Sequence, residues 1–231
     1  MGTRDRVYLL HGLLGTSRYH CARQIEAWQS RFDVVPIDLP GHGQSTKDAS
    51  VPYVEDAVDA VASQIETHGS GHIVAISYLG SAVACRAIPL IPGKVTSVVL
   101  AGIVTDIPEE IFKPWTRSFI ELADQNPRLR EWYERMHGKR WRGTLEAYCE
   151  DVDVRYQSAA LVRGRAIGDL GVLTLIINGE KKSNERAMAH DAASLAPSVR
   201  GCVVPGAGHI VCMEQPDIFN WEVERFWMVA A

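Results

Sequence analysis

The sequence lacks the long apolar run that a membrane span or a secretory signal needs. Residues 1–6 are polar and basic, and the apolar run that follows covers only residues 7–10. A transmembrane helix needs about 20 consecutive apolar residues, and a signal peptide an apolar region of about 7–15 residues. We therefore expect a protein that does not enter a membrane, and we expect it in the cytoplasm.

Close cysteine pairs and a large excess of one charge are also missing. The five cysteines are odd in number, widely spaced and contain no CxxC pair, which argues against a disulfide framework or a structural zinc site. The formal net charge is only −4, which gives no reason to expect a nucleic acid or an anionic membrane as partner. We expect a small-molecule substrate and no metal or organic cofactor. The oligomeric state stays open.

Strand-like and helix-like segments alternate along the chain. Its 231 residues, 46% of them hydrophobic, suffice for one domain with a sizeable core. The apolar patterns predict strands at 7–10, 32–39, 72–76, 95–104, 172–177 and 200–204, and helices at 17–30, 53–68, 81–88, 185–195 and 215–228. This alternation predicts an α/β protein whose mostly parallel sheet is flanked by helices.

Residues 105–168 interrupt the alternation. They hold three of the six tryptophans, many arginines and no strand-like run, so we predict two or three helices inserted between strands. Within them, residues 128–142 (RLREWYERMHGKRWR) mix basic and aromatic side chains. Two interpretations remain open: this stretch holds an acidic substrate or phosphate, or it is an amphipathic helix with solvated arginines.

Ser77 stands where a predicted strand meets a predicted helix. A serine at such a junction lies on a sharp turn, and the helix N-terminus offers backbone N–H groups beside its hydroxyl. The strict nucleophile pattern is G-x-S-x-G, whereas this chain has Ala75 and Leu79 at the flanking positions. Ala75 is small enough for the turn, but Leu79 departs from the pattern. By itself, Ser77 fits either a nucleophile or a helix cap.

His209 follows a glycine-rich loop, residues 205–208, after the last predicted strand. Ligands of parallel α/β sheets bind at the carboxyl ends of the strands, so we expect His209 near Ser77. A neutral imidazole accepts the serine proton and returns it to a leaving group. Acyl transfer also needs N–H donors for the developing oxyanion, and the backbone amides of Leu13 and Tyr78 fit those two places.

The order of these landmarks resembles that of the α/β-hydrolase superfamily. They are His11-Gly12, the turn at 38–45 (DLPGHGQS), Ser77, residues 178–180 (NGE) and the loop at 206–209 (GAGH). The resemblance implies an α/β-hydrolase core formed by residues 1–104 and 169–231. It also implies a helical cap at 105–168, inserted after the sixth strand of the family, and a serine nucleophile.

The triad acid is missing from its usual place in this superfamily. A G-x-x-D arrangement normally follows the penultimate strand, but here residues 179–182 read GEKK, so Lys182 stands in the position of the acid. Three hypotheses follow: Asp106, after the preceding strand, supplies the acid; Glu180 or another nearby carboxylate supplies it; or the chain has none. Asp106 is the first candidate, although it is equally placed to cap the next helix.

These features predict a hydrolase of a small ester, thioester or C–C bonded substrate. The predicted catalytic residues are Ser77, His209 and Asp106, and the predicted oxyanion hole is formed by Leu13 and Tyr78. One alternative is a biosynthetic lyase, cyclase or dehydratase, because residues 179–183 (GEKKS) and the short cap are similar to the menaquinone-pathway SHCHC synthases. The other is a non-catalytic ligand-binding member of the fold, suggested by Leu79 and Lys182.

Overall fold

A single parallel sheet forms the centre of the computed structural model, which describes residues 4–230. The strand order is β2-β1-β3-β4-β5-β6, and every neighbouring pair is parallel. The chain thus builds outward in one direction after β1 and in the other after β3, so the order reverses between these two strands. At that point loops diverge and leave a crevice beyond the carboxyl ends of the strands. The strands are β1 (Arg6–Leu10), β2 (Asp33–Ile37), β3 (Gly71–Ile76), β4 (Val95–Ala101), β5 (Leu173–Gly179) and β6 (Val199–Val204).

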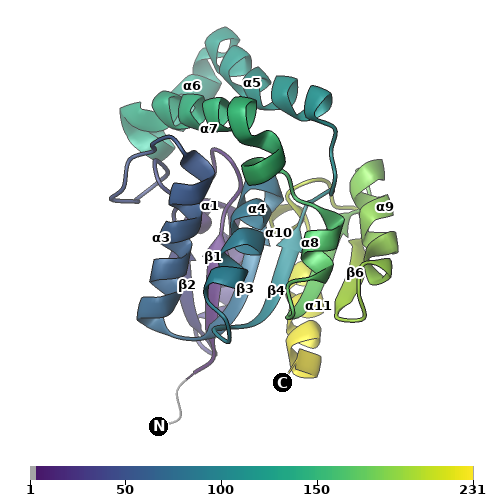
Figure 1. Cartoon of the computed structure of the whole chain (residues 1–231). Helices are drawn as coiled ribbons and strands as arrows, with labels where there is room; N and C mark the ends of the chain where they lie inside the picture. The colour runs from purple at the N-terminus through teal and green to yellow at the C-terminus, as the bar shows by residue number, and fades with distance from the viewer. Residues whose placement is uncertain (1–3, 231) are drawn as a thin grey trace.

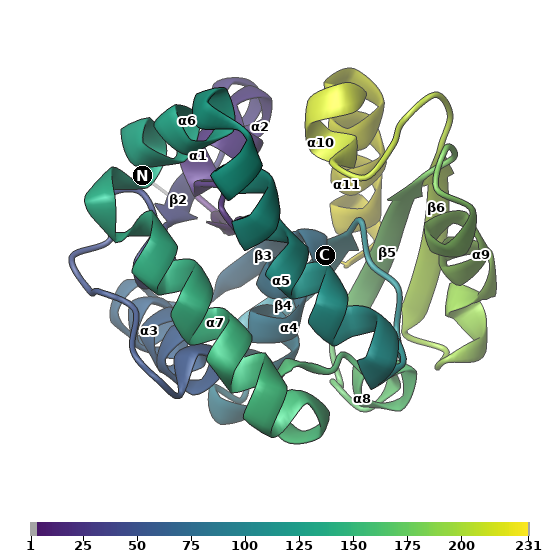
Figure 2. The ribbon, with the colours of Figure 1, turned by 90° about the horizontal axis from the view of Figure 1, so that it is seen from above.

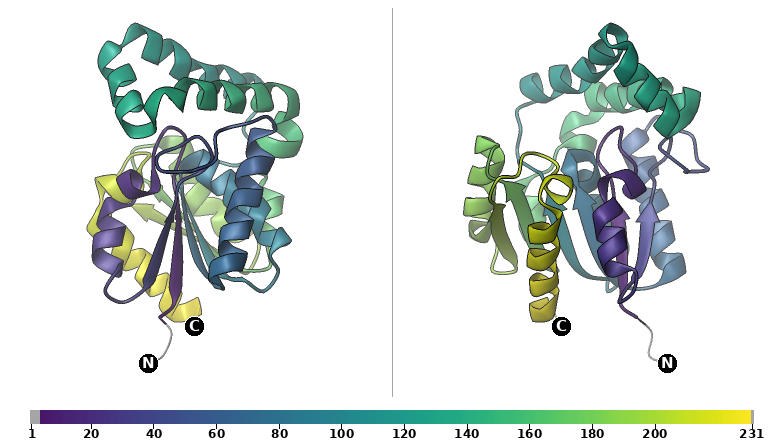
Figure 3. Two further views of the ribbon diagram at one scale, coloured as in Figure 1. Left: turned by 90° about the vertical axis from the view of Figure 1, so that its left-hand side faces the viewer. Right: turned by 180° about the vertical axis from the view of Figure 1, so that it is seen from behind.

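Helices cover both faces of the sheet, as Figure 3 shows from two sides. The first face carries α3 (Tyr53–His68), α4 (Ser77–Ala87), α8 (Gly164–Gly168) and α9 (Ser183–Asp191). The second carries α1 (Ser17–His20), α2 (Ala22–Trp28), α10 (Val211–Glu214) and α11 (Pro216–Ala230). Because both faces are covered, β3 is buried along its whole length, as its apolar sequence predicts. Three short 3₁₀ helices and one π-helical turn complete the fold as described. The 3₁₀ helices are η1 (Ile88–Leu90), η2 (Gly138–Arg140) and η4 (Ala192–Ser194), and the π-helical turn is η3 (Tyr156–Ala160).

Three helices between β4 and β5 lie above the carboxyl ends of the strands (Figure 1). They are α5 (Glu109–Gln125), α6 (Pro127–His137) and α7 (Trp141–Arg155), and we call them the upper helices. Seen from above, they lie over the β3 and β4 side of the sheet and leave β5 and β6 uncovered (Figure 2). They bury apolar side chains among themselves and against Leu14 of the loop after β1.

The predicted alternation and the parallel, helix-flanked sheet are confirmed. Helix boundaries differ from the prediction at several places, and α9, for example, covers Ser183–Asp191 where 185–195 was predicted. The first helical stretch is divided at Cys21 into α1 and α2, and α1 begins after Thr16, whose side chain accepts a hydrogen bond from the Tyr19 amide. The helix after β3 begins at Ser77 itself and not at Ser81. Of the helices described, none is both long and apolar enough to span a membrane.

Candidate active site

Ser77 occupies a strained turn between β3 and α4. Its φ is +61°, in the left-handed region that residues with a Cβ rarely adopt. Gly12, on the loop after β1, leaves the room that this turn needs, because a Cβ at position 12 would lie 2.6 Å from the Cβ of Ser77. Strain of this kind persists where the surrounding structure holds it, and it concentrates at functional sites.

The departure at Leu79 from the serine pattern has a structural reason. Leu79 is 1% exposed and packs in the apolar core on the α4 side of the sheet. The close approach that the pattern normally assigns to a small residue falls one position later, at Gly80. A Cβ there would lie 2.8 Å from the carbonyl oxygen of His11. Leu79 therefore does not obstruct the turn at Ser77.

A chain of two hydrogen bonds connects Ser77 to a histidine and a carboxylate. Ser77 Oγ lies 2.8 Å from Nε2 of His209, and Nδ1 of His209 lies 2.7 Å from Oε1 of Glu185. When the ring proton is on Nδ1, Nδ1–H donates a hydrogen bond to Glu185. Nε2 is then free to accept the serine hydroxyl proton. The structure thus brings together Ser77 and His209, as the sequence predicts, and adds Glu185 from α9.

Asn178, at the end of β5, fixes the segment that carries Glu185. Its Nδ2 donates to the carbonyl oxygens of Glu185 (2.7 Å) and Ile103 (2.8 Å). Its Oδ1 accepts from the amides of Gly102 (2.9 Å) and Ile103 (3.0 Å). The buried amide is therefore fully hydrogen-bonded, which makes it a rigid connection between β4, β5 and the first turn of α9.

Asp106 does not contact His209, so the prediction that it orients this histidine is wrong. Its Oδ2 accepts from the amide of Gly164 (2.9 Å), and its own amide donates to the carbonyl of Val162 (2.9 Å). The chain runs past the active-site end of β4 before it reaches Asp106, and the carboxylate turns to the start of α8. Asp106 therefore joins the segment before the upper helices to the segment after them. Nor does it cap α5, whose N-cap is Pro108.

Glu180, the second candidate for the acid, binds the backbone of the loop at 205–208 that precedes His209. Its Oε2 accepts from the amide of Gly206 (2.9 Å), and Glu214 accepts from the amide of Gly208 (2.7 Å). The alternative of another nearby carboxylate is the one that the geometry favours. Glu185 lies in the first turn of α9, which begins at Ser183, directly after the position of the missing acid.

A cavity of about 500 Å³ opens over Ser77 and His209. Leu13 and Tyr78 both line it, as expected for oxyanion-hole residues. The Tyr78 hydroxyl points elsewhere and accepts from the amide of Val162 (2.9 Å), and burial raises the pKa of Tyr78. The aromatic side chains that line the cavity are those of Tyr78, Phe112, Trp115, Phe119, Trp132 and Tyr133.

The basic stretch at 128–142 contributes aromatic side chains to the cavity and directs its arginines elsewhere. Trp132 and Tyr133 line the cavity, whereas none of its described arginines does. Arg140 and Arg142 form ion pairs with Asp48 and Asp124, respectively, away from the cavity. Among the described residues that line the cavity, the charged side chains are those of Lys182 and Glu185. Among the described residues, no group of three or more His, Cys, Asp or Glu side chains is arranged to hold a metal ion.

The chain belongs to the alpha/beta hydrolase family, whose model matches residues 7–222. Among solved structures, it is similar to NosK from Streptomyces actuosus, with 43% identity over 98% of this chain and 99% of that one and a TM-score of 0.96. MenH from S. aureus has 18% identity and a TM-score of 0.77, covering 100% of this chain and 96% of that one. A thermophilic esterase from Thermogutta terrifontis has 20% identity and a TM-score of 0.72, covering 100% and 92%. The last two likenesses concern the fold alone. A search of curated protein sequences found no match.

Proposed function

We propose that this chain is a serine hydrolase of carboxylic esters or thioesters with an apolar acyl group. The observation that carries the proposal is the hydrogen-bonded chain Ser77–His209–Glu185 at the base of an apolar cavity. In this mechanism Ser77 Oγ attacks the substrate carbonyl while Nε2 of His209 takes its proton. Glu185 holds the ring orientation and stabilises the imidazolium that forms. His209 then returns the proton to the leaving alcohol or thiol.

The backbone amides of Leu13 and Tyr78 serve as the oxyanion hole in this proposal. They belong to the loop after β1 and to the first turn of α4, on two sides of Ser77, and donors in such positions stabilise the tetrahedral intermediate. Water, activated by His209, then attacks the acyl-enzyme and releases the acid, which regenerates Ser77. The upper helices act as the cap, and their aromatic side chains bind the acyl group.

The cavity lining favours this reaction over the elimination or cyclisation of a carboxylate-bearing substrate. That alternative needs cationic side chains to hold the carboxylate. The described lining carries one, Lys182, together with the carboxylate of Glu185, and none of the described arginines of the 128–142 stretch lines the cavity. Aromatic side chains on one face of α5, at positions 112, 115 and 119, instead offer an apolar wall.

Covalent labelling tests the proposal directly. We expect a fluorophosphonate to add one phosphonyl group to the wild type, as read by intact mass, and none to Ser77→Ala. Rates of hydrolysis of aryl and alkyl esters and thioesters by the unlabelled wild type then show which acyl groups it prefers. A folded wild type that neither reacts with the probe nor hydrolyses any of these substrates would contradict the proposal.

A further inference from the structure

Four buried histidines surround the loop after β1, next to the proposed active site. They are His11, His20, His42 and His137, each at most 8% exposed. Three of them are in contact one after another. The rings of His11 and His42 are tilted by 50° with centroids 4.8 Å apart, and those of His42 and His137 meet edge to face at 87° with centroids 5.3 Å apart. The proposed Ser77–His209–Glu185 mechanism uses none of the four.

Their nitrogens bind the backbone of residues 12–15, which we call the oxyanion loop. The Gly12 amide donates to Nδ1 of His20 (3.2 Å), and Nδ1–H of His11 donates to the Gly12 carbonyl (2.8 Å). A planar trans peptide points its C=O and N–H in opposite directions. Fixing the Gly12 carbonyl therefore also fixes the direction of the Leu13 N–H, one of the two proposed oxyanion donors.

Leu14, the next residue, is held on both sides. Its φ of +53° is unfavourable for a leucine. Its amide donates to Nε2 of His42 (3.3 Å), and its carbonyl accepts from Nε2–H of His137 (3.0 Å). A strained residue of this kind keeps its conformation only while its neighbours hold it, so these two histidines maintain the bend that follows Leu13.

In three of the four rings, those of His11, His42 and His137, the second nitrogen fixes the tautomer. Nδ1 of His137 accepts from the Gly43 amide (3.1 Å), so the proton of this ring is on Nε2, facing Leu14. Nδ1–H of His42 donates to the Pro40 carbonyl (3.0 Å), which leaves Nε2 to accept from Leu14. Nε2 of His11 accepts from the Leu39 amide (2.9 Å). Each of these three rings is thus a neutral bridge with one donor and one acceptor.

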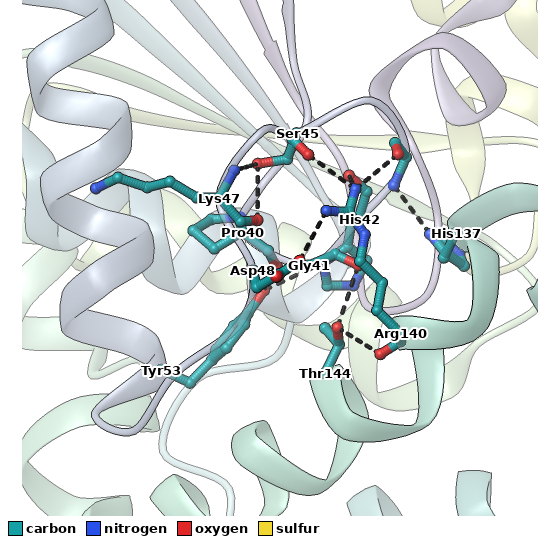
Figure 4. A network of polar contacts seen from close by, with 11 residues as sticks. Pro40, Gly41, His42, Ser45, Lys47, Asp48, Tyr53, His137, Arg140 and Thr144 are labelled. Atoms are coloured by element: carbon teal, nitrogen blue, oxygen red, sulfur yellow. Dashed lines mark hydrogen bonds and ion pairs between the residues drawn. The ribbon is translucent and has the colours of Figure 1, made fainter.

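His137 differs from the other three because it belongs to the upper helices, where it ends α6. We propose that His137 is a positioning residue that couples the upper helices to the oxyanion loop and so aligns the Leu13 N–H with the reacting carbonyl. This inference rests on the proposed serine mechanism. Figure 4 shows His137 reaching from its helix to the segment after β2, residues 40–48, beside Arg140 and Thr144.

Arg140 and Thr144 dock the same helices without touching the oxyanion loop. Arg140 Nη2 donates to the carbonyls of Gly43 (2.9 Å) and Ser45 (2.8 Å), and Thr144 Oγ1 donates to that of Gly41 (3.1 Å). His137 contacts both the segment at 40–48, through Gly43, and the oxyanion loop, through Leu14, whereas Arg140 and Thr144 contact only the former. Substitutions can therefore separate positioning of the loop from docking of the upper helices.

The test uses two amides in place of His137. An asparagine places its oxygen where Nδ1 was, so His137→Asn keeps the acceptor for Gly43 and loses the donor to Leu14. A glutamine reaches the place of Nε2, so His137→Gln keeps the donor. Misplacement of catalytic groups by about 1 Å costs about 100-fold in rate. We therefore expect His137→Asn to lower kcat and the fluorophosphonate labelling rate by at least about tenfold, with KM little changed.

The control variants are His137→Gln, Arg140→Ala and His68→Asn, the last an exposed histidine on α3. We expect His137→Gln to keep kcat within about threefold, since one donor hydrogen bond is retained. Arg140→Ala should lower Tm or raise KM without the fall in kcat. Equal kcat in His137→Asn and wild type, or a fall in both His137 variants that follows their loss of Tm, would overturn the positioning role.

Amide hydrogen exchange gives a readout that needs no activity. We expect the Leu13 and Leu14 amides to exchange faster in His137→Asn than in His137→Gln or Arg140→Ala. If the wild type is neither labelled nor active, the proposed function fails, and this comparison still decides the coupling. Unchanged exchange at both amides in His137→Asn would overturn it.

Discussion

At the scale of single residues, Glu185 invites the sharpest test of the proposed mechanism. Its Oε1 accepts from His209, while its Oε2 is buried without a hydrogen-bond partner among the described residues. In Glu185→Gln, the amide oxygen is thus free to turn toward Nδ1 and keep the catalytic tautomer, but the negative charge is lost. We expect kcat to fall about 10²–10³-fold, less than the roughly 10⁴-fold cost of an amide that imposes the wrong tautomer. Steady-state kinetics of purified variants measure this.

The matched variants are Asp106→Asn and Glu180→Gln, which remove the two carboxylates that the sequence suggested first. Neither side chain contacts His209. Asp106 accepts a hydrogen bond from the backbone amide of Gly164, and Glu180 accepts one from that of Gly206. Their kcat should stay within about threefold of the wild type, because each loses at most one outlying hydrogen bond. A large loss in either of them, with Glu185→Gln near wild type, would remove Glu185 from the mechanism.

Ser77 and His209 were predictable because Ser77 follows directly on one strand and His209 follows the short loop after another, and parallel strands bring their carboxyl ends to one edge. Glu185 was not predictable in the same way. Its position depends on where α9 begins and on the Asn178 amide that holds its first turn, two features that no local pattern in the sequence specifies. The roles of His11, His42 and His137 were not predictable for a similar reason, since backbone partners of these rings lie 28 to 123 residues away along the chain.

At the scale of elements, the connections of the upper helices depend on Asp106. Its φ of +54° suits aspartate better than alanine, and its carboxylate accepts from the first amide of α8. We expect Asp106→Ala to lower the free energy of unfolding by about 1–3 kcal/mol, from the lost hydrogen bond and the left-handed backbone. Asp106→Asn should lower it less, because asparagine tolerates the same φ.

Urea unfolding of both variants measures the difference, and fluorophosphonate labelling of the folded proteins serves as control. The labelling rate should stay close to that of the wild type, since Asp106 acts on the frame of the upper helices and not on Ser77. Equal unfolding free energies for Asp106→Ala and wild type would contradict this role. The sequence predicted two or three helices in this segment, where the structure has four, α5 to α8. It did not indicate the Asp106–Gly164 contact, because these residues lie 58 positions apart.

At the scale of the whole molecule, the buried histidines make stability depend on pH. Burial lowers the pKa of His11 to about 4 and that of His20 to about 3, and it also lowers the pKa of His42 and His137. Protonation would also remove the acceptor that each ring offers to a backbone amide. Around His137, the Asp38 carboxylate favours its charged form and Arg140 opposes it, but burial is the largest effect.

The sign follows from comparing the folded and unfolded chains. Unfolded histidines titrate near pH 6.5, so below that pH the unfolded state binds more protons than the folded state, and the free energy of unfolding falls. The free energy of unfolding is therefore at its full value above about pH 6.5. It decreases as the pH falls toward the folded pKa values, by up to about 1.4 kcal/mol per pH unit for each histidine.

Urea unfolding at pH 7.5, 6.5, 5.5 and 5.0 should show this decrease. In this window the Asp38 carboxyl, whose pKa is lowered because hydrogen bonds outweigh the opposing effect of burial, stays charged. His11→Asn should make the decline shallower by about one histidine's share, whereas a free energy of unfolding that is constant from pH 7.5 to 5.0 would show that these rings are not neutral bridges in the folded protein.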